Sequence, residues 1–584
     1  MLDAKKIFSS LKRRANLPSL DEIKIIFHTL KPKEKITFLL LIVAFIVSVL
    51  GVLFVLNDKV AIEVPYPGGT LHEGIVGTPR FLNPLIAVSD ADQDINQLVY
   101  AGLLKSDGQG GLTPELAKSY EISPDGLVYT FTLKDNLTWH DGKPITAEDV
   151  AFTIKTAKTP LIKSPKRANW EGVEVEVQNP LTIKFILKKP YTPFLENATL
   201  RMLPKHIWEE ITPDQISLSQ FNIEPVGAGP YRIKKIYRNS SGIINSYVLE
   251  SFSEYALGEP YITRMVFNFY NSESELLTNY LNNGIQSMGS ISPKNITEVL
   301  RHGSDVHAMT LSRIFGVFFN QNKNKTLADY SVRKALLLAT NKEKIVTEIL
   351  ADYGTTISHP IPPGTFGSMN TNVSEEKTYD PEAAKKLLEK SGWKKNKSGF
   401  FEKSNKKSAT ELAITLSTSM TPDLVATAEM LKKMWEEVGI KTEIKTFDIG
   451  DFDKNIIRPR DYDALLFGEI AGYDPDPFAF WHSSQRNDPG LNIALYANIT
   501  VDRLLEDARA ISDPKKQTQK YAAFQKEIQK DIPAIFLYSP HYLYAVPNYL
   551  KGNDTAHITT PSERFATVNQ WYIDTKKVWK FLLD

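Results

Sequence analysis

An unbroken apolar run near the N-terminus is the first feature of the hydrophobic pattern. Residues 36–56 (ITFLLLIVAFIVSVLGVLFVL) contain no charged side chain. About 20 apolar residues span the core of a bilayer as a helix, because each residue rises about 1.5 Å. The run is longer than the apolar core of a cleaved signal peptide, and no suitable cleavage site follows it. The pattern therefore predicts an uncleaved transmembrane signal anchor.

Positive charge lies on one side of this run. The first 35 residues contain nine Lys and Arg side chains, and basic residues beside a membrane span tend to stay in the cytoplasm. We therefore expect a basic cytoplasmic segment over residues 1–35 and a single pass through the cytoplasmic membrane. A linker should follow over residues 57–67, where Pro65 and Pro67 disfavour helix, with the rest of the chain on the extracytoplasmic face. Residues 23–30 (IKIIFHTL) predict a short amphipathic helix at the inner surface.

Strand patterns are frequent in the first half of the remaining chain. Residues 129–133 (YTFTL) and 173–177 (VEVEV) alternate with a period of two, and residues 265–270 (MVFNFY) are β-branched and aromatic. Residues 146–158 predict a helix with Thr146 as its N-cap.

Helices are clearer in the second half. Residues 380–390 (DPEAAKKLLEK) and 421–438 predict helices that end at Gly392 and Gly439, and a strand over residues 440–447 follows. This alternation predicts an α/β fold. The chain has 584 residues, and a single core rarely grows beyond roughly 250–300 residues, so we expect at least two lobes.

Composition excludes several kinds of site. The chain has no cysteine, which rules out disulfides, thiolate nucleophiles, Cys-ligated zinc and a lipid-modified N-terminal cysteine. Nine of the 69 basic and four of the 68 acidic residues lie within the first 56 positions, so the rest carries a net charge near −4. That balance argues against a nucleic-acid surface.

Motifs for catalysis are missing from the sequence. The ten histidines are scattered, and HExxH, GxSxG and phosphate-loop patterns do not occur. We therefore expect no enzyme activity, no metal site and no cofactor.

Two aromatic clusters stand out instead. Residues 139–150 (WHDGKPITAEDV) predict a structural corner, with a tight turn followed by a helix start. Residues 467–484 (FGEIAGYDPDPFAFWHSS) follow an apparent strand, and loops at strand ends are where open α/β sheets bind ligands. We select Tyr473, Asp474, Asp476 and Trp481 as ligand-binding candidates, because aromatic walls with a few polar groups are typical of small-molecule pockets. A turn-rich loop with core aromatics remains the alternative.

At these clusters the chain resembles the family 5 extracellular solute-binding proteins, the oligopeptide- and dipeptide-binding group. The likeness covers about residues 68–550, and its motifs occur in the family's order. They are 68–71 (GGTL), 79–85 (PRFLNPL), 99–104 (VYAGLL), 116–121 (LAKSYE), 123–126 (SPDG), 139–150, 226–231 (VGAGPY), 329–336 (DYSVRKAL), 379–384 (YDPEAA), the Asp-Pro loop and 536–538 (FLY).

The resemblance implies a two-lobed clamshell of the type II periplasmic-binding-protein class. Lobe I would comprise residues 68–105, 225–310 and 541–584, an inserted subdomain residues 106–224, and lobe II residues 311–540. A small solute, in this family a peptide, would bind between the lobes, and the closed form would deliver it to the permease subunits of an ABC importer.

The resemblance also implies specific cleft residues. Family members that bind peptides usually hold the ligand's amine with an Asp in a W-x-x-D-like loop. Here Glu469 stands near the place of the Trp, and Asp474 is the best candidate for the acid. From their own places at strand ends, Thr78, Phe319 and Asn320 are further cleft candidates, with ordinary strand-end packing as the alternative. Arg333 is expected to be a structural ion-pair partner.

Two other functions remain open. A membrane-anchored sensor or peptide-capture module would bind the ligand without transport. A surface peptidase would need a nucleophile or a metal site. We expect the extracytoplasmic part to be monomeric.

Overall fold

The computed structural model describes residues 29–368, 379–405, 408–511 and 513–579. The chain divides into two compact units, residues 1–66 with 574–584, and residues 67–573. Residues 1–28, with most of the basic segment and of the expected amphipathic helix, lie outside the described part.

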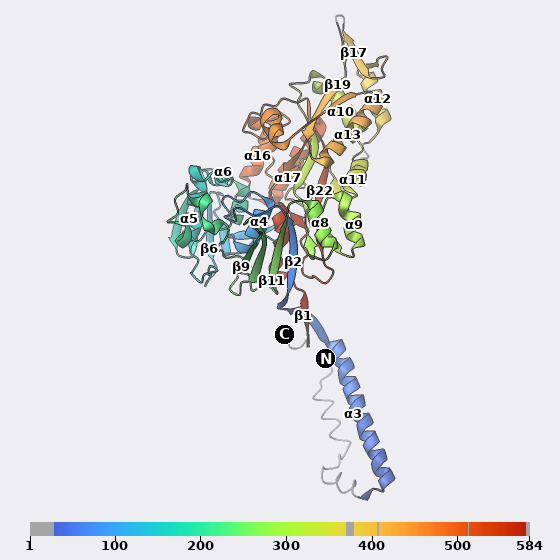
Figure 1. Cartoon of the computed structure of the whole chain (residues 1–584). Helices are drawn as coiled ribbons and strands as arrows, with labels where there is room; N and C mark the ends of the chain where they lie inside the picture. The colour runs from blue at the N-terminus through green and yellow to red at the C-terminus, as the bar shows by residue number, and fades with distance from the viewer. Residues whose placement is uncertain (1–28, 369–378, 406–407, 512, 580–584) are drawn as a thin grey trace. The chain divides into compact units, whose positions relative to one another are not determined.

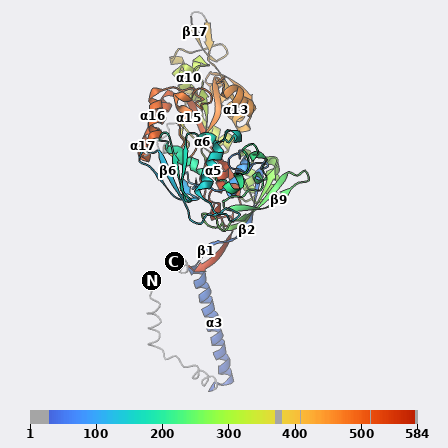
Figure 2. The ribbon, with the colours of Figure 1, turned by 90° about the vertical axis from the view of Figure 1, so that its left-hand side faces the viewer.

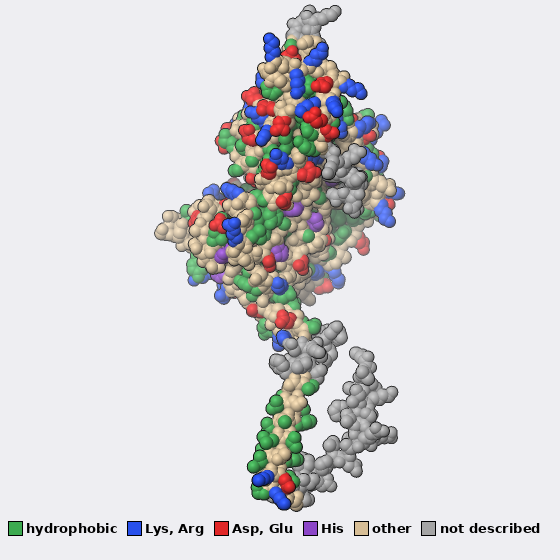
Figure 3. Space-filling view, turned by 90° about the vertical axis from the view of Figure 1, so that its right-hand side faces the viewer, with side chains coloured by type: hydrophobic (Ala, Val, Ile, Leu, Met, Phe, Trp, Pro, Cys, Tyr) green, Lys and Arg blue, Asp and Glu red, His purple; other side chains and the backbone are tan. Residues whose placement is uncertain are grey.

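The first unit is built on one long apolar helix. Helix α3 (Pro32–Val60) carries a stretch, Pro32–Val52, with a mean hydropathy of 2.6 and no buried share, which is long and apolar enough to cross a membrane. Hydrophobic side chains cover the visible length of this helix, and Lys and Arg lie at one end (Figure 3). The helix includes the predicted span and extends beyond it at both ends.

A two-stranded ribbon completes this unit. Strand β1 (Ala61–Tyr66) pairs antiparallel with β24 (Asp574–Trp579), with Ala61 opposite Trp579 and Tyr66 opposite Asp574. The expected linker is therefore the last turn of α3 followed by a strand, and residues 574–579, expected in lobe I, belong to this ribbon. Pro65 is tolerated because each strand of the ribbon has a free edge.

The second unit is organised around a 13-stranded mixed sheet (Figure 1). Most of its strands form one continuous path. In spatial order these are β20 (Lys441–Phe447), β19 (Ala413–Ser419), β21 (Ala464–Ile470), β14 (Arg313–Phe319), β22 (Ala534–Val546), β12 (Ser287–Met288), β2 (Gly68–Val76), β11 (Ile262–Tyr270), β10 (Ile244–Ser251) and β9 (Tyr231–Arg238).

The chain passes between the two halves of this sheet in two places. Strand β13 (Asp305–Leu311) runs through Ser312 directly into β14. Strand β22 changes partner along its length, because residues 534–538 pair with β14 and residues 541–546 pair with β13. We keep the names lobe I, inserted subdomain and lobe II for the ranges given above.

Helices cover both faces of the sheet in lobe II. Alternate residues of β14 face opposite cores: Val317 packs beneath α13 (Pro422–Glu437), and Phe318 packs with residues of α16 (Ile499–Ala510) and α17 (Pro514–Asp531). In Figure 1, α13 and α16 lie on opposite sides of the strands. The predicted helices over 380–390 and 421–438 are confirmed as α12 (Pro381–Lys390), with Asp380 as its N-cap, and α13.

The inserted subdomain has its own antiparallel sheet, ordered β5 (Ala117–Ile122), β6 (Val128–Leu133), β8 (Thr182–Ile186) and β7 (Glu174–Asn179). Helix α5 (Ala147–Lys158) begins at Thr146, which forms a capping box with Asp149. Trp139 is fully buried beside the turn that closes at Gly142. The predicted strands and the structural corner are confirmed, and Figure 2 shows α5 and β6 together in this part.

Candidate functional site

A polar cavity of about 220 Å³ lies where lobe I, the inserted subdomain and lobe II meet. Lobe I and the inserted subdomain supply most of its wall, and Tyr473 is the lobe II residue among the described lining residues. The lining comprises Pro84, Ala87, Gln93, Asn96, Gln97, Lys166, Asn169, Trp170, Glu196, Asn197, Thr199, Leu200, Arg201, Tyr473, Thr559, Thr560, Ser562 and Glu563.

Two cationic side chains line this cavity without a partner. Arg201 follows the 3-10 helix η2 (Thr192–Thr199), and its backbone is fixed on lobe I by a bridge to Gly102. Neither Arg201 nor Lys166 makes an ion pair or side-chain hydrogen bond with the described residues. Burial lowers the pKa of both groups; the charges of Glu115 and then Glu563 oppose the shift at Arg201, and Glu563 opposes it at Lys166. Because unpaired buried charge is costly, these groups favour an anionic ligand group in the cavity.

Glu563 lies on the 3-10 helix η9 (Pro561–Phe565) and is held by Thr559. The Thr559 main-chain N–H and its hydroxyl each donate a 2.7 Å hydrogen bond to the Glu563 carboxylate. These two hydrogen bonds fix the position of the Glu563 carboxylate in the cavity lining. The amide oxygen of Gln97, a residue only 8% exposed, lines the same cavity and receives no hydrogen bond from the described residues.

The Asp-Pro loop reaches the lobe interface, but its two acids have partners already. The Asp474 carboxylate accepts hydrogen bonds from Tyr521 (3.2 Å) and Gln517 (3.4 Å), both on α17. Burial, reinforced by the charge of Asp476, raises the pKa of Asp474 to about 6. Asp474 is absent from the cavity lining given above, so its carboxylate is placed to support the loop from the lobe II side.

Asp476 connects lobe II to the inserted subdomain. Arg509 of α16 grips its carboxylate with both Nε (2.8 Å) and Nη2 (2.5 Å), and the Tyr191 hydroxyl donates a 3.2 Å hydrogen bond from the subdomain. The Thr192 hydroxyl donates to the main-chain carbonyl of Arg509 at 3.2 Å. We call Asp476, Arg509, Tyr191 and Thr192 the interlobe clasp, because together they join the two sides of the cleft.

Tyr473 is the loop residue that lines the cavity. Its hydroxyl is buried close to the side chains of Glu563, Ser106 and Thr559. Burial, followed by the charge of the nearby Glu563, raises the pKa of Tyr473 above its ordinary value. The phenol is therefore neutral, and it lies close to the Glu563 carboxylate in the cavity wall.

Trp481 lies in the core of lobe II. It is 1% exposed and packs against Phe318, Tyr496, Phe524 and Phe536. Trp481 is therefore a core residue, as in the alternative interpretation of this loop as a turn with core aromatics. It is absent from the described cavity lining.

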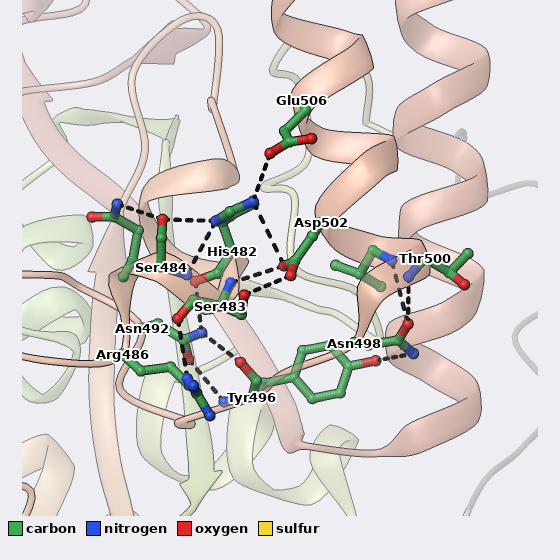
Figure 4. A network of polar contacts seen from close by, with 12 residues as sticks. His482, Ser483, Ser484, Arg486, Asn492, Tyr496, Asn498, Thr500, Asp502 and Glu506 are labelled. Atoms are coloured by element: carbon green, nitrogen blue, oxygen red, sulfur yellow. Dashed lines mark hydrogen bonds and ion pairs between the residues drawn. The ribbon is translucent and has the colours of Figure 1, made fainter.

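A polar network follows Trp481 and ties the end of the loop to α16 (Figure 4). His482 Nδ1 lies 2.7 Å from the Ser484 hydroxyl, and Nε2 faces Glu506 (3.4 Å) and Asp502 (3.8 Å). Ser, His and an acid are the residue types of a hydrolytic triad. Here, however, the His482 Nδ1 also accepts a hydrogen bond from the main-chain N–H of Ser484, and the imidazole stacks on Phe478. The contacts therefore act as a local helix cap.

Phe319 and Asn320 lie at the opposite end of β21 from the Asp-Pro loop. Strand β14 starts at the lobe crossing, where Arg313 pairs with Ile470, and ends with Phe319 opposite Ala464. Six residues of strand span about 20 Å. The Asn320 amide donates to the Arg460 carbonyl at 2.9 Å and closes a turn there. The antiparallel register therefore places both residues away from the Asp-Pro loop, and both are absent from the described cavity lining; their part in ligand binding stays a prediction.

Three further predicted residues can be placed. Thr78 follows β2 and is partly exposed, but it is absent from the described cavity lining. The Arg333 guanidinium donates to four main-chain carbonyls rather than to a carboxylate, which corrects the expected ion pair. Glu469 is buried on β21 with Oε1 unpartnered, and burial raises its pKa well above the ordinary value.

Sequence reasoning missed the charged residues of the cavity, Lys166, Glu196, Arg201 and Glu563. They come from segments that are far apart in the chain, and none stands in an unusual motif. The pairing of residues 201–202 with 101–102 brings the segments together, and the hydrophobic pattern does not predict such a contact.

Comparison with known proteins adds independent information. Residues 111–490 match the family model described as "Bacterial extracellular solute-binding proteins, family 5 Middle". The chain is 28% identical over 518 residues to the "Oligopeptide-binding protein AppA" of Bacillus subtilis, covering 87% of this chain and 92% of that protein. It is 26% identical over 506 residues to the "Dipeptide-binding protein" of Escherichia coli, covering 82% and 90%.

A solved structure shows the same architecture. NikZ from Campylobacter jejuni, crystallised in complex with Ni(L-His), superposes with a TM-score of 0.68 at 29% identity, covering 86% of this chain and 99% of NikZ. The matching family model covers more than half of the chain, and the relatives match nearly over their full lengths. The chain therefore belongs to the family 5 bacterial extracellular solute-binding proteins.

Proposed function

We propose that this protein is the substrate-binding component of an ABC importer and that it holds a short peptide in the cavity between its lobes. The observation that carries the proposal is the polar cavity itself, with Arg201 and Lys166 unpaired in its wall. The relatives named above as oligopeptide- and dipeptide-binding proteins support a peptide as the ligand.

The cavity favours a small ligand with a carboxylate. A guanidinium binds a carboxylate through two parallel hydrogen bonds, and a lysine adds a point charge. Pockets for drug-sized ligands enclose about 300–1,000 Å³, and this cavity of about 220 Å³ is smaller. We therefore propose peptides of two or three residues, with the C-terminal carboxylate at Arg201.

Entry of the ligand requires the lobes to part. The interlobe clasp joins the inserted subdomain to lobe II through the hydrogen bonds that Tyr191 donates to Asp476 and Thr192 donates to the Arg509 carbonyl. The two crossings, at Ser312 and within β22, are the natural hinge, because hinges are a few residues at element ends that absorb rotation. Opening at these crossings would expose the cavity, and closure would present the loaded form to the permease.

Helix α3 supports a membrane location. Its apolar stretch is long enough for one pass, and the preceding Lys and Arg residues favour an N-terminus in the cytoplasm. We propose that α3 anchors the binding unit on the extracytoplasmic face, where it acts as a monomer.

A thermal-unfolding experiment on the full-length protein in detergent tests the proposal. A ligand that binds only the folded state stabilises it by RT ln(1 + [L]/Kd), about 2.7 kcal/mol at 100 times Kd. We expect di- and tripeptides to raise Tm and a nonapeptide to have no effect. The variant Arg201→Gln should lose the shift, and Arg301→Gln, on an exposed helix end, should keep it. A shift with sugars alone would contradict peptide binding.

Uptake in cells tests the transport step. A labelled dipeptide that raises Tm should enter wild-type cells and stay outside cells that lack this protein. Binding in vitro with unchanged uptake in the deletion strain would instead favour a sensor without transport.

A further inference from the structure

Two charged groups of the cavity wall, Glu196 and Glu563, have no role in the proposed function, and only Glu563 has both carboxylate oxygens occupied by hydrogen bonds from Thr559. Glu196 lies on η2 of the inserted subdomain and faces the Asp-Pro loop of lobe II. Its Oε1 accepts a short hydrogen bond from the main-chain N–H of Asp474. Its Oε2 receives no hydrogen bond from the described residues and lies against Gly472, so this oxygen can still accept a hydrogen bond.

The loop leaves room for this carboxylate because residue 472 is a glycine. A Cβ atom at Gly472 would lie 2.1 Å from Oε2 and 2.6 Å from Oε1 of Glu196. Such distances are far below van der Waals contact, so any side chain at this position would displace Glu196. The bare backbone of Gly472 and the N–H of Asp474 thus fix the place of the carboxylate in the cavity.

The surroundings of Glu196 are acidic. Burial is the main cause that raises the pKa of Glu196 to about 8, and the charges of Asp474, Glu563 and Asp476 add to it, while the Asp474 N–H opposes the shift. Tyr191, another titratable neighbour, is a neutral phenol with a pKa raised by burial.

The negative charge of Glu196 is not balanced by an ion pair among the described residues. Arg509, which lies near Tyr191, is engaged with Asp476 in the clasp. No Lys or Arg among the described residues forms an ion pair with Glu196. The cavity therefore has an acidic region at Glu196 in addition to the basic groups Arg201 and Lys166.

We propose that Glu196 binds the ammonium group of the ligand and makes the site specific for a zwitterion whose carboxylate is held by Arg201 and Lys166. The proposal rests on the proposed function and narrows it to peptides with a free amine. The specificity would depend on the inserted subdomain, with the Asp-Pro loop supplying backbone contacts.

Proton exchange follows from this arrangement. In the closed form with an empty cavity, the carboxyl group of Glu196 holds a proton near neutral pH, because burial raises its pKa to about 8. When the ammonium group binds, the O–H bond gives up its proton to the solvent and a carboxylate–ammonium pair forms. Binding of the peptide therefore releases up to one proton at pH 7.

The experiment begins with the full-length protein in detergent and a mixture of di- and tripeptides of the common amino acids, examined by native mass spectrometry. The peptide retained most strongly is then synthesised in three forms: free, N-acetylated and C-terminally amidated. Calorimetry at pH 7, in phosphate and in Tris buffer, gives the affinity and the number of protons released.

Acetylation of the amine should weaken binding to the wild-type protein about tenfold to a hundredfold, the range expected for a hydrogen bond to a charged group. In Glu196→Gln the free and acetylated peptides should bind about equally, and the proton release should vanish. Glu210→Gln, an exposed residue of the same subdomain, is the matched control and should behave as wild type. Gly472→Ala should lose part of the discrimination by displacing Glu196.

Each other outcome has a defined meaning. If the free peptide binds wild type and Glu196→Gln equally, or if the acetylated peptide binds wild type as well as the free one, the role of Glu196 is refuted while peptide capture stands. The comparison of free and acetylated peptide needs no variant, so a folding defect cannot obscure it. If no peptide is retained from the mixture, the proposed function itself fails.

Discussion

Arg564 holds one wall of the cavity through buried charges. It is 1% exposed, donates two 2.7 Å hydrogen bonds to Asp94 on α4 (Asp90–Val99) and one of 3.0 Å to Glu73 on β2. Tyr544 donates a 2.9 Å hydrogen bond to Glu73 from β22. Since Arg564 and Glu563 are neighbours on η9, this network also positions the Glu563 carboxylate.

Replacement of Arg564 should be strongly destabilising. Arg564→Met leaves Glu73 and Asp94 as uncompensated buried carboxylates, which costs about 3–5 kcal/mol. Urea unfolding followed by tryptophan fluorescence measures the loss. Arg301→Met, at an exposed helix end, should change the free energy of unfolding by less than about 0.5 kcal/mol. Equal effects in the two variants would contradict the structural role of the network.

Stability should fall as pH rises between about 4 and 8. The pKa of Glu196 is raised from 4.5 to about 8 and that of Asp474 from 3.8 to about 6, so the folded state binds protons that the unfolded chain has lost. Glu196→Gln should flatten the decline between pH 6 and 8. Urea unfolding of the ligand-free protein at several pH values measures the slope, which Glu210→Gln should leave unchanged.

Residue chemistry explains which site residues the sequence predicts. The sequence indicates the Asp-Pro loop because its aromatic, Gly, Pro and Asp residues are consecutive in the chain. The structure places this loop at the lobe interface, with Tyr473 in the cavity wall. The roles of Asp474 and Trp481 depend on α17 and on the lobe II core, which are remote in sequence. The absence of a side chain at Gly472 becomes informative only when Glu196 is seen opposite it.

Among the elements, helices with caps were the most predictable. Thr146 and Asp380 begin helices where the sequence indicates, because capping is a contact between residues three positions apart. The β1–β24 ribbon was not predictable, since it joins residues more than 500 positions apart in a short, half-polar strand pair. The pairing of β14 with β21 was not predictable for the same reason. Its antiparallel register places Phe319 at the far end of β21 from the Asp-Pro loop.

A substitution in the interlobe clasp should speed the release of peptide. Asp476→Asn removes the charge that accepts the interlobe hydrogen bond from Tyr191, so the closed arrangement should be less stable and peptide should dissociate faster, by about tenfold or more. Stopped-flow displacement of a fluorescent dipeptide measures the dissociation rate. Asp453→Asn, which breaks an exposed pair with Arg458, is the matched control. An unchanged rate in Asp476→Asn would show that the clasp does not hold the cleft shut.

The β1–β24 ribbon belongs to a different compact unit from the binding unit. Truncation after Ile573 removes β24 and should leave the Tm and the peptide affinity of the binding unit within experimental error. Thermal unfolding and calorimetry on the truncated chain check this. A lower affinity would mean that β24 supports the cavity after all.

For the molecule as a whole, the absence of cysteine allows a direct test of the hinge. The variant Lys189→Cys/Lys515→Cys places one exposed label on the inserted subdomain and one on α17 of lobe II. If the lobes rotate about Ser312 and β22, the distance between spin labels should be longer and broader without peptide and shorter with it. Two labels within lobe II, at Lys432 and Lys515, should show no change.

The charged groups of the cavity lie on one side of the cleft, which determines whether a solute is recognised before or after it is enclosed. Lys166, Glu196, Arg201 and Glu563 all belong to lobe I or its inserted subdomain, whereas lobe II adds an aromatic ring. An open cleft therefore already presents every charged group that the cavity contains among the described residues. A solute can be sorted by charge on one wall while water is still present, and the arrival of lobe II serves to exclude that water. Selection would then precede closure, and a solute with the wrong charges could leave before the cleft shuts.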